Sequence, residues 1–534
     1  MRKSGILGKL MLGLLLCGTQ GVFCADAKVE NNTHEIKSHR ELYDEEFSQA
    51  MDYMFRGDIE NAKKLMVSAA ERGVASALWY AYKLTGDEKY LIEAAECGDK
   101  STYFAAAVAL VNKNQPNTSV EDYKKAGKWY QAAADGECSA DALDAVCNLA
   151  IMHRVGQGGF TPDYDKAMSL YQKAADFLHP RAVREIGIKY LLQSDKAEPS
   201  EKLRLFSLGY SHLAMAALKE DAKAAEMLKN RKVQHFDKAN KAFIDAVERC
   251  IACRKYDDEV IRLLKISATE NHLFANAVLG EYYFSRDKKE ALKYFRAAAK
   301  QGNLAAKSMI ASGSYYNIAD VNEQMTYCKE LADMGFKAWK YNYAQLLESC
   351  GDIQKAVQIF KDLAEAGDAH SQYRMYKMVF RKNQNVISLR QAHAYLLAAA
   401  AQHHGEAEIS AGGWGTRDML GIPPRTAMTL LIQGLFNGGF YNVSLREHAY
   451  DEITEGYAYG RGLKKDVEFA KQLCLMRVKD GTAHAHYILG NLYENGAFGE
   501  KDMVNAKKQY MDGAAKNDEA CKTALKRLNS ESAK

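Results

Sequence analysis

The chain repeats one spacing of small and large residues along most of its length. An alanine is followed by a large residue four positions later and by a small residue four positions after that, as at Ala506, Tyr510 and Ala514. Residues with this spacing lie on one stripe of an α-helix and suit burial against a neighbouring helix. Glycine often follows the stripe, as at Gly481, and suits a left-handed helix C-cap because it has no Cβ atom. The pattern predicts a unit of helix, turn, helix and turn.

The first residue of this stripe serves as the anchor of each unit, and most anchors are 31 to 43 residues apart. One spacing is shorter, at 25 residues, and one is longer, at 51. A sustained period of this size is typical of a solenoid built from helical pairs. We therefore predict an all-α solenoid of about 12–13 antiparallel helix–turn–helix repeats over residues 42–529. The anchors are Ala62, Asp87, Ala126, Ala167, Gly209, Val260, Ala291, Gln324, Ala356, Ala392, Ala427, Ala470 and Ala506.

The other helix of each pair has a small residue followed three residues later by an aromatic or similarly large one, and in four pairs these are glycine and tyrosine. Glycine inside a helix costs about 1 kcal/mol relative to alanine. A helix that accepts this cost repeatedly must gain a close approach to another helix. We therefore expect these residues to belong to the core rather than to a binding site. The pairs are Gly187 with Tyr190, Gly280 with Tyr283, Gly456 with Tyr459 and Gly490 with Tyr493.

Three segments interrupt the rhythm and are predicted to be irregular connections: residues 191–208, 219–258 and 405–426. The second is expected to contain an additional helix. The third has the strongest loop signal, with Gly412-Gly413-Trp414-Gly415 and Pro423-Pro424. Insertions in solenoids map to loops that often bind partners. Trp414 is therefore the candidate partner-binding residue, expected to be exposed, although a simple connector is the favoured interpretation of this segment.

The N-terminus has the pattern of a secretory signal peptide. Basic residues precede a short apolar run, Leu10–Leu16, and Ala25-Asp26-Ala27 offers a cleavage site. The run is shorter than the roughly 20 apolar residues that span a bilayer, and no later segment is apolar enough to do so. We predict a signal peptide at 1–27, a flexible polar lead-in at 28–41, and a disordered tail at 530–534. Lipidation of Cys17 or Cys24 stays open.

Composition narrows the function further. Lysine and arginine total 72 and aspartate and glutamate 68, so no basic excess indicates nucleic acid or an anionic membrane as a partner. Nine of the 11 cysteines remain after cleavage, and their disulfide connectivity cannot be read from spacing. Cys250 and Cys253 have a redox or zinc spacing, but no second such pair accompanies them. Packing or a local disulfide is favoured over a metal site.

No constellation of catalytic residues accompanies the repeats. The chain has no phosphate-binding loop, no HExxH and no Gly-x-Ser-x-Gly motif. His403-His404 and the pair His484 and His486 are the only histidine clusters, and we interpret them as surface or groove residues. Residues two apart on a helix do not share a face, so His484 and His486 should point in different directions. We predict no catalytic residue, no cofactor and no metal ligand.

Two stretches, residues 148–176 and 488–518, resemble the SEL-like repeat, a relative of the tetratricopeptide repeat. The resemblance implies a right-handed superhelix whose groove holds a protein or peptide, with an adaptor role in envelope assembly, quality control or host contact. A secreted, cysteine-rich branch of the family binds and hydrolyses β-lactams, with a cysteine pair in each repeat that this chain lacks. The matching residues are Leu149, Gly156, Gly158, Asp165, Lys166, Ala167, Tyr171, Lys173, Ala174 and Ala175, and Leu489, Gly490, Tyr493, Gly496, Gly499, Asp502, Ala506, Tyr510, Ala514 and Ala515.

The favoured hypothesis is an exported, non-enzymatic scaffold for protein–protein interaction, periplasmic or secreted, from a bacterial rather than a eukaryotic source. One alternative is a secreted β-lactam-binding or β-lactam-hydrolysing repeat protein. Another is a chaperone-like adaptor of the endoplasmic reticulum. The sequence leaves partner identity and oligomeric state open.

Overall fold

The computed structural model describes residues 44–113, 118–135, 139–230, 236–312, 320–379, 387–438 and 442–531. These ranges contain helices and no strand, so the all-α prediction is confirmed for them. None of the helices in the described ranges is long and apolar enough to cross a membrane. The predicted signal peptide, the lead-in, Cys17, Cys24 and residues 532–534 of the predicted tail lie outside the described residues. The prediction of a disordered tail is wrong for residues 530 and 531, which belong to helix α30 (Glu519–Glu531).

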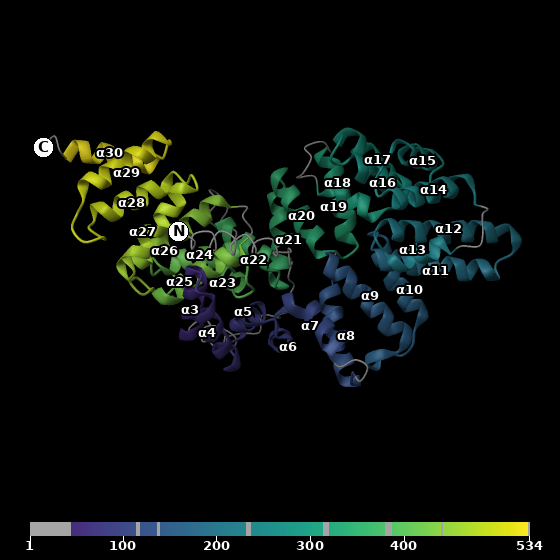
Figure 1. The fold of residues 1–534 in the computed structure, drawn as a ribbon, viewed down its shortest axis with the longest axis horizontal. Coiled ribbons are helices and arrows are strands. Elements are labelled where there is room, and N and C mark those ends of the chain that lie inside the picture. Colours follow the sequence, from purple (N-terminus) through teal and green to yellow (C-terminus); the bar gives the residue numbers. More distant parts are fainter. Residues whose placement is uncertain are drawn as a thin grey trace. The chain divides into compact units, whose positions relative to one another are not determined.

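The described helices form two compact units, one containing residues 44–94 together with those from 364 to 531, and the other lying within residues 95–363. Each unit is a succession of helical hairpins (Figure 1). In the first unit the helices are α3 (Glu45–Arg56), α4 (Ile59–Glu71), α5 (Ala75–Thr85), α6 (Glu88–Glu96), α22 (Ala369–Val379), α23 (Leu389–Ala400), α24 (Gly405–Gly415), α25 (Pro424–Asn437), α26 (Val443–Tyr459), α27 (Val467–Lys479), α28 (His484–Glu494), α29 (Met503–Ala515) and α30 (Glu519–Glu531). In the second they are the 3-10 helix η1 (Lys100–Thr102), α7 (Tyr103–Lys113), α8 (Val120–Ala134), α9 (Ala140–Val155), the 3-10 helix η2 (Gln157–Gly159), α10 (Tyr164–Ala175), α11 (Pro180–Lys196), α12 (Pro199–Leu218), α13 (Ala222–Lys229), α14 (Lys238–Cys253), α15 (Asp258–Thr269), α16 (Ala275–Tyr283), α17 (Lys288–Lys300), α18 (Leu304–Ala311), α19 (Val321–Asp333), α20 (Lys337–Ser349) and α21 (Ile353–Glu365).

The predicted stripe is the packing face of the second helix in each hairpin. Most anchors are buried, but Asp87 is exposed and accepts the Lys89 backbone N–H at 3.0 Å, and Gln324 is half-buried. The large residue four positions after every anchor is buried, from Met66 in α4 to Tyr510 in α29. Burying a large apolar side chain in this way contributes about 1.5–3 kcal/mol in each repeat. These buried residues are Met66, Leu91, Tyr130, Tyr171, Leu213, Leu264, Phe295, Cys328, Phe360, Leu396, Leu431, Cys474 and Tyr510.

The four glycines predicted in the first helices lie where a neighbouring element leaves little room for a side chain, and for two of them this neighbour is an aromatic ring. A Cβ atom on Gly280 would lie 2.6 Å from the ring of Phe295, and one on Gly490 would lie 2.6 Å from the ring of Tyr510. Both rings belong to the large position of the stripe. The prediction that these glycines permit close helix contact is therefore confirmed. Gly481 has the predicted left-handed backbone, with φ +91°.

The prediction of an irregular connection at 405–426 is wrong for its first half, because residues 405–415 form α24. The glycines that suggested a loop are buried: Gly412 and Gly415 are contact points against α25, and Gly413 lies against His448 of α26. A Cβ atom on Gly412 would lie 2.7 Å from the carbonyl oxygen of Ala427, and one on Gly434 would lie 2.7 Å from that of Gly405. Glycines destabilise an isolated helix, but in this pair their lack of a Cβ atom lets the backbones of α24 and α25 approach closely.

The prediction of a long connection at 191–208 is also wrong. Helix α11 continues to Lys196 and α12 begins at Pro199, so only two residues join them. Pro199 suits the start of the helix, because a backbone N–H in the first turn has no hydrogen-bond partner within the helix and its absence costs nothing there. Residues 219–258 do carry an additional helix, α13, which precedes α14.

The N-terminal hairpin packs against repeats from the C-terminal part of the sequence, a contact that the repeat pattern does not predict. Phe55 of α3 stacks on Tyr457 of α26 with ring centroids 6.3 Å apart and meets Phe469 of α27 edge-on at 6.4 Å. Arg56 forms an ion pair of 2.7 Å with Asp466, 410 positions away in the sequence. These residues belong to or border one hydrophobic core that includes α3–α6 and α24–α28.

Candidate protein-interaction surface

The structure places Trp414, the candidate binding residue, in α24 and not on a loop. Its side chain is half-buried against a core cluster that includes Ile422, and its Nε1 donates a hydrogen bond of 2.5 Å to the Tyr376 hydroxyl. The expectation of an exposed tryptophan is therefore wrong. Its role in partner binding stays a prediction.

The histidine clusters are held inside the repeats. His484 and His486 point in different directions, as predicted: His484 Nδ1 lies 3.0 Å from Asp518, whereas His486 Nδ1 lies 2.9 Å from Gln509. His486 is buried, so its interpretation as a surface or groove residue is wrong. His404 lies 3.0 Å from His370, and burial lowers the pKa of His404 to about 3. These contacts are structural.

Several cysteines also act as packing residues. Cys328 and Cys474 occupy the large position of the stripe in α19 and α27 and are fully buried. Burial raises the pKa of each thiol to about 12. A thiol with a raised pKa is a poor nucleophile and a poor metal ligand, because the thiolate is the reactive form. Within the described parts of the chain, no group of three or more His, Cys, Asp or Glu side chains could hold a metal ion.

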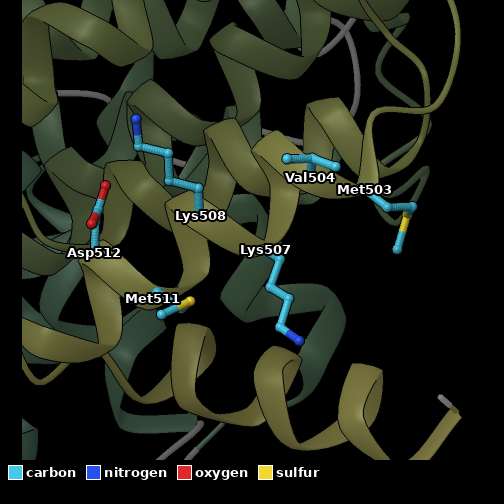
Figure 2. A pocket seen from close by; sticks show the side chains of 6 residues that line it. All are labelled: Met503, Val504, Lys507, Lys508, Met511 and Asp512. Carbon is cyan, nitrogen blue, oxygen red and sulfur yellow. The ribbon is translucent and has the colours of Figure 1, made fainter.

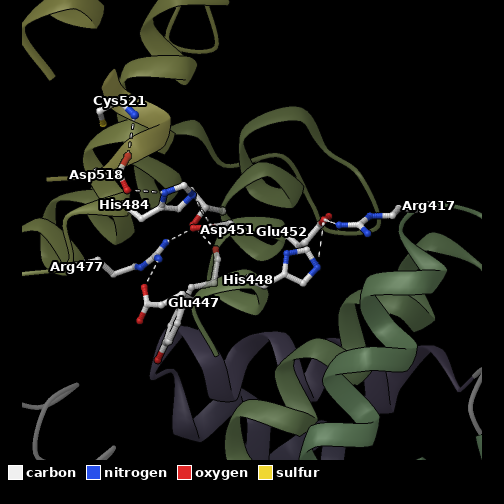
Figure 3. Close-up of polar contacts among 11 residues, drawn as sticks. Arg417, Glu447, His448, Asp451, Glu452, Arg477, His484, Asp518 and Cys521 are labelled. Carbon is white, nitrogen blue, oxygen red and sulfur yellow. Dashed lines mark hydrogen bonds and ion pairs between the residues drawn. The ribbon is translucent and has the colours of Figure 1, made fainter. Parts of the chain in front are cut away.

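A buried charge network connects the last repeats (Figure 3). Arg477 of α27 has only 4% of its side chain exposed and pairs with Asp451 at 2.7 Å and Glu447 at 2.5 Å, both on α26. His484 of α28 lies 3.5 Å from Asp451 and 3.0 Å from Asp518, whose carboxylate accepts the Cys521 N–H at the start of α30. Burial raises the pKa of Asp451 despite its pairing with Arg477. The network therefore links α26, α27, α28 and the start of α30 through charged and polar side chains that are partly shielded from water.

A partly exposed aromatic and basic surface lies on the repeat formed by α16 and α17 and on the connection that precedes α15. We define the tyrosine cluster as Tyr256, Tyr282, Tyr283 and Tyr294, all half-buried. Adjacent rings are in contact: their centroids are 5.4 Å apart for Tyr256 and Tyr282, 4.9 Å for Tyr282 and Tyr283, and 5.6 Å for Tyr283 and Tyr294. The last pair is stacked, with an interplanar angle of 11°. The rings therefore form one continuous surface rather than four separate side chains.

Cations cover the outer side of the tyrosine cluster. The Arg286 guanidinium lies 4.2 Å from the ring centroid of Tyr282, and the Lys265 and Lys293 ammonium groups lie 5.6 and 5.4 Å from Tyr283 and Tyr294. A hydrogen bond to Tyr283 raises the pKa of Lys265, which keeps this cation charged. Tyrosine and arginine are enriched among the residues that dominate protein–protein binding energy.

A sequence model of the Sel1 repeat matches residues 117–137, 143–176, 278–303, 456–476 and 483–508. Five segments of this chain therefore match the Sel1 repeat. The resemblance found in the sequence is thereby confirmed. No curated protein matches the sequence significantly.

Solved structures with Sel1-like repeats share distant similarity with the chain. A protective antigen of uropathogenic Escherichia coli, c5321, described as displaying an SLR fold, is 18% identical over 84% of this chain and 91% of its own, with a TM-score of 0.44. A Sel1 repeat protein from Oxalobacter formigenes is 22% identical over 59% of this chain and 94% of its own, with a TM-score of 0.43.

The Sel1 repeat at 278–303 contains part of the tyrosine cluster. Gly280, Ala291 and Phe295 supply the packing positions of this repeat, and Tyr282, Tyr283 and Tyr294 project beside them. The sequence analysis assigned Tyr283 to the core by its spacing from Gly280, but the structure leaves it half-buried. A signal for the cluster was present in the sequence: Tyr282-Tyr283-Phe284 is an aromatic run followed by Arg286.

Proposed function

We propose that this protein is an exported, non-enzymatic scaffold that binds a partner protein through the tyrosine cluster. Sel1 repeat proteins are typically scaffolds for protein–protein interaction, and this coarser assignment follows from the repeats themselves. The observation that supports the specific surface is the contiguous set of half-buried tyrosine rings with Arg286 above Tyr282. Rigid aromatic rings lose little conformational freedom on binding, so such a surface can contribute affinity efficiently.

The proposed partner is a protein or peptide and the proposed compartment is the periplasm or the extracellular space of a bacterium. The signal-peptide pattern over residues 1–27 supports export. The near balance of basic and acidic residues in the chain gives no support for nucleic acid as the ligand. Mass spectrometry of the mature N-terminus tests export directly: a protein that retains residues 1–27 in the cytoplasmic fraction would contradict it.

The test of the binding surface is a crosslinking pull-down from the envelope or secreted fraction with the wild-type chain and three variants. Arg286→Glu and Tyr282→Ala should each reduce recovery of the specific partner at least about tenfold, the effect typical of a binding hot spot. Tyr164→Ala is the matched control, because Tyr164 is 49% exposed on α10, away from the cluster. Circular dichroism confirms that each variant is folded. Equal recovery by all forms would refute the surface, and no specific partner with any form would refute the scaffold.

The β-lactam alternative gains no support from the cysteines that the structure describes in the stripe, since Cys328 and Cys474 fill packing positions. A purified preparation should leave a chromogenic cephalosporin at its background rate of hydrolysis. Turnover above that rate would restore the enzymatic alternative.

A further inference from the structure

Helix α29 has a second face that the packing of the repeat does not use. Its inner face buries Ala506, Tyr510 and Gly513. On the outer face, Met503 is 44% exposed, Val504 81% and Met511 56%. These three residues and Lys507, Lys508 and Asp512 line one shallow pocket along the helix (Figure 2). We call this set of six side chains on α29 the α29 ridge.

The apolar residues of the α29 ridge are not a requirement of the repeat. Relative to the anchor Ala506, Met503 lies three positions before it, Val504 two positions before it and Met511 five positions after it. At the same positions around the anchor Ala291, helix α17 has Lys288, Lys289 and Arg296. Apolar residues also occur at the first and third of these positions in other repeats, as at Val467 and Leu475 around Ala470, so the repeat permits them without requiring them. At the second position every other anchor has a polar residue, so the apolar Val504 is particular to α29. Exposed apolar side chains that lie together, rather than singly, are typical of binding sites.

We propose that the α29 ridge binds an amphipathic helix of a partner protein that carries acidic residues beside its apolar face. This inference rests on the proposed scaffold function and names the partner's chemistry at one surface. Met503, Lys507 and Met511 are spaced four residues apart, so they share a face on which a second helix can lie. Methionine side chains adapt to different partner shapes because they are unbranched and flexible.

The charge of the α29 ridge selects the acidic partner. Lys507 and Lys508 lie between the apolar side chains, and none of the described carboxylates forms an ion pair with either lysine. Asp512 is the single acidic residue of the ridge. Glutamates beside the partner's apolar face would approach both ammonium groups, whereas lysines there would meet repulsion. Complementary charge speeds association and rejects partners of like charge.

The test uses the full mature chain and two labelled synthetic helices, with fluorescence anisotropy as the readout. Both probes carry leucines at positions i, i+4 and i+7; one has glutamates beside them and the other has lysines. The acidic probe should bind at least about tenfold more tightly than the basic probe, a difference that corresponds to one power of ten in Kd. Added salt should weaken the binding of the acidic probe, since the lysines are exposed.

Variants separate the α29 ridge from the rest of the surface. Val504→Glu and Lys507→Glu should each weaken binding of the acidic probe at least about tenfold. Val443→Glu is the matched control, because Val443 is an exposed valine near the start of α26, with 56% exposure. Far-ultraviolet circular dichroism should be unchanged in all three variants. These substitutions act at exposed positions, so loss of the fold is not expected.

The inference is overturned if the two probes bind equally, if neither binds, or if Val504→Glu has no effect. Sedimentation that shows a dimer abolished by Val504→Glu would assign the ridge to a second copy of the chain. Binding to anionic vesicles that Val504→Glu abolishes would assign it to a membrane surface. Either result would refute an acidic helix as the binding partner of the α29 ridge. The pull-down with Arg286→Glu tests the scaffold function independently of the α29 ridge. Normal capture of a partner together with no binding of the acidic probe would therefore refute the ridge alone and leave the scaffold function standing.

Discussion

Replacing Gly490 with alanine tests the close packing on which each repeat depends. Alanine favours a helix over glycine by about 1 kcal/mol, so an unconstrained position would become more stable. In this structure the new Cβ atom would lie 2.6 Å from Tyr510 Cε1 and 2.8 Å from Cδ1. The Tyr510 ring is 1% exposed, and its hydroxyl donates a hydrogen bond of 2.7 Å to Glu494. The ring therefore cannot move aside without losing contacts.

The expected net effect follows from these two opposing contributions. Inserting a methyl group into a well-packed core typically costs 1–3 kcal/mol. Subtracting the propensity gain leaves Gly490→Ala destabilising by about 1 kcal/mol. Replacing the ring by Tyr510→Leu removes the obstacle, so alanine at position 490 should then stabilise the helix by up to about 1 kcal/mol. The effect of the same substitution should reverse its sign, with a coupling of about 2 kcal/mol.

Hydrogen exchange of the α28 amides measures this effect in the repeat concerned, since a long repeat array does not unfold in a single step. The four proteins of the double-mutant cycle are the wild type, Gly490→Ala, Tyr510→Leu and the double variant. The free energy of local opening should fall for Gly490→Ala in the wild-type background and rise in the Tyr510→Leu background. A stabilising effect in both backgrounds would show that the ring does not limit the approach of the helices, and the reasoning would be refuted.

Three further perturbations test other parts of the structure. Arg477→Leu should cost about 3 kcal/mol because it removes the closest cation from two largely buried carboxylates on α26, whereas the control Arg461→Ala removes a pair that is 67% exposed on the arginine side and should cost at most about 1 kcal/mol; urea unfolding that gave equal losses would contradict a buried network. Arg56→Ala should release the N-terminal hairpin, so limited proteolysis should cut between α3 and α6 faster than in the wild type, and an unchanged rate would mean that the ion pair with Asp466 does not hold it. Burial lowers the pKa of His272 to about 3, below its unfolded value near 6.5, so the unfolded state binds the proton more readily. The contribution of His272 to the free energy of unfolding should be constant above pH 6.5 and fall by about 1.4 kcal/mol per pH unit as the pH decreases toward 3. His272→Gln should reduce this slope in denaturation series at pH 7, 6 and 5, and an identical slope would exclude His272 as its source.

The sequence by itself determined the unit of this fold. A stripe of small and large residues, a glycine C-cap and a second helix with an interior glycine followed three residues later by tyrosine are local patterns that can be read from the spacing of residues within a helix. For this reason the positions of Ala506, Tyr510 and Gly490 in the core could be predicted without any knowledge of distant contacts.

Only the tertiary structure decided where the same residue type has a different structural role. Gly412 and its neighbours look like a loop when read locally, but α25 lies close enough to make glycine necessary within a helix. The pairing of Arg56 with Asp466 and the burial of Arg477 depend on which helices become neighbours in space. A helical period reports which face of a helix is buried, but not which distant segment buries it. Contacts between remote segments therefore could not be read from the spacing of residues along the chain.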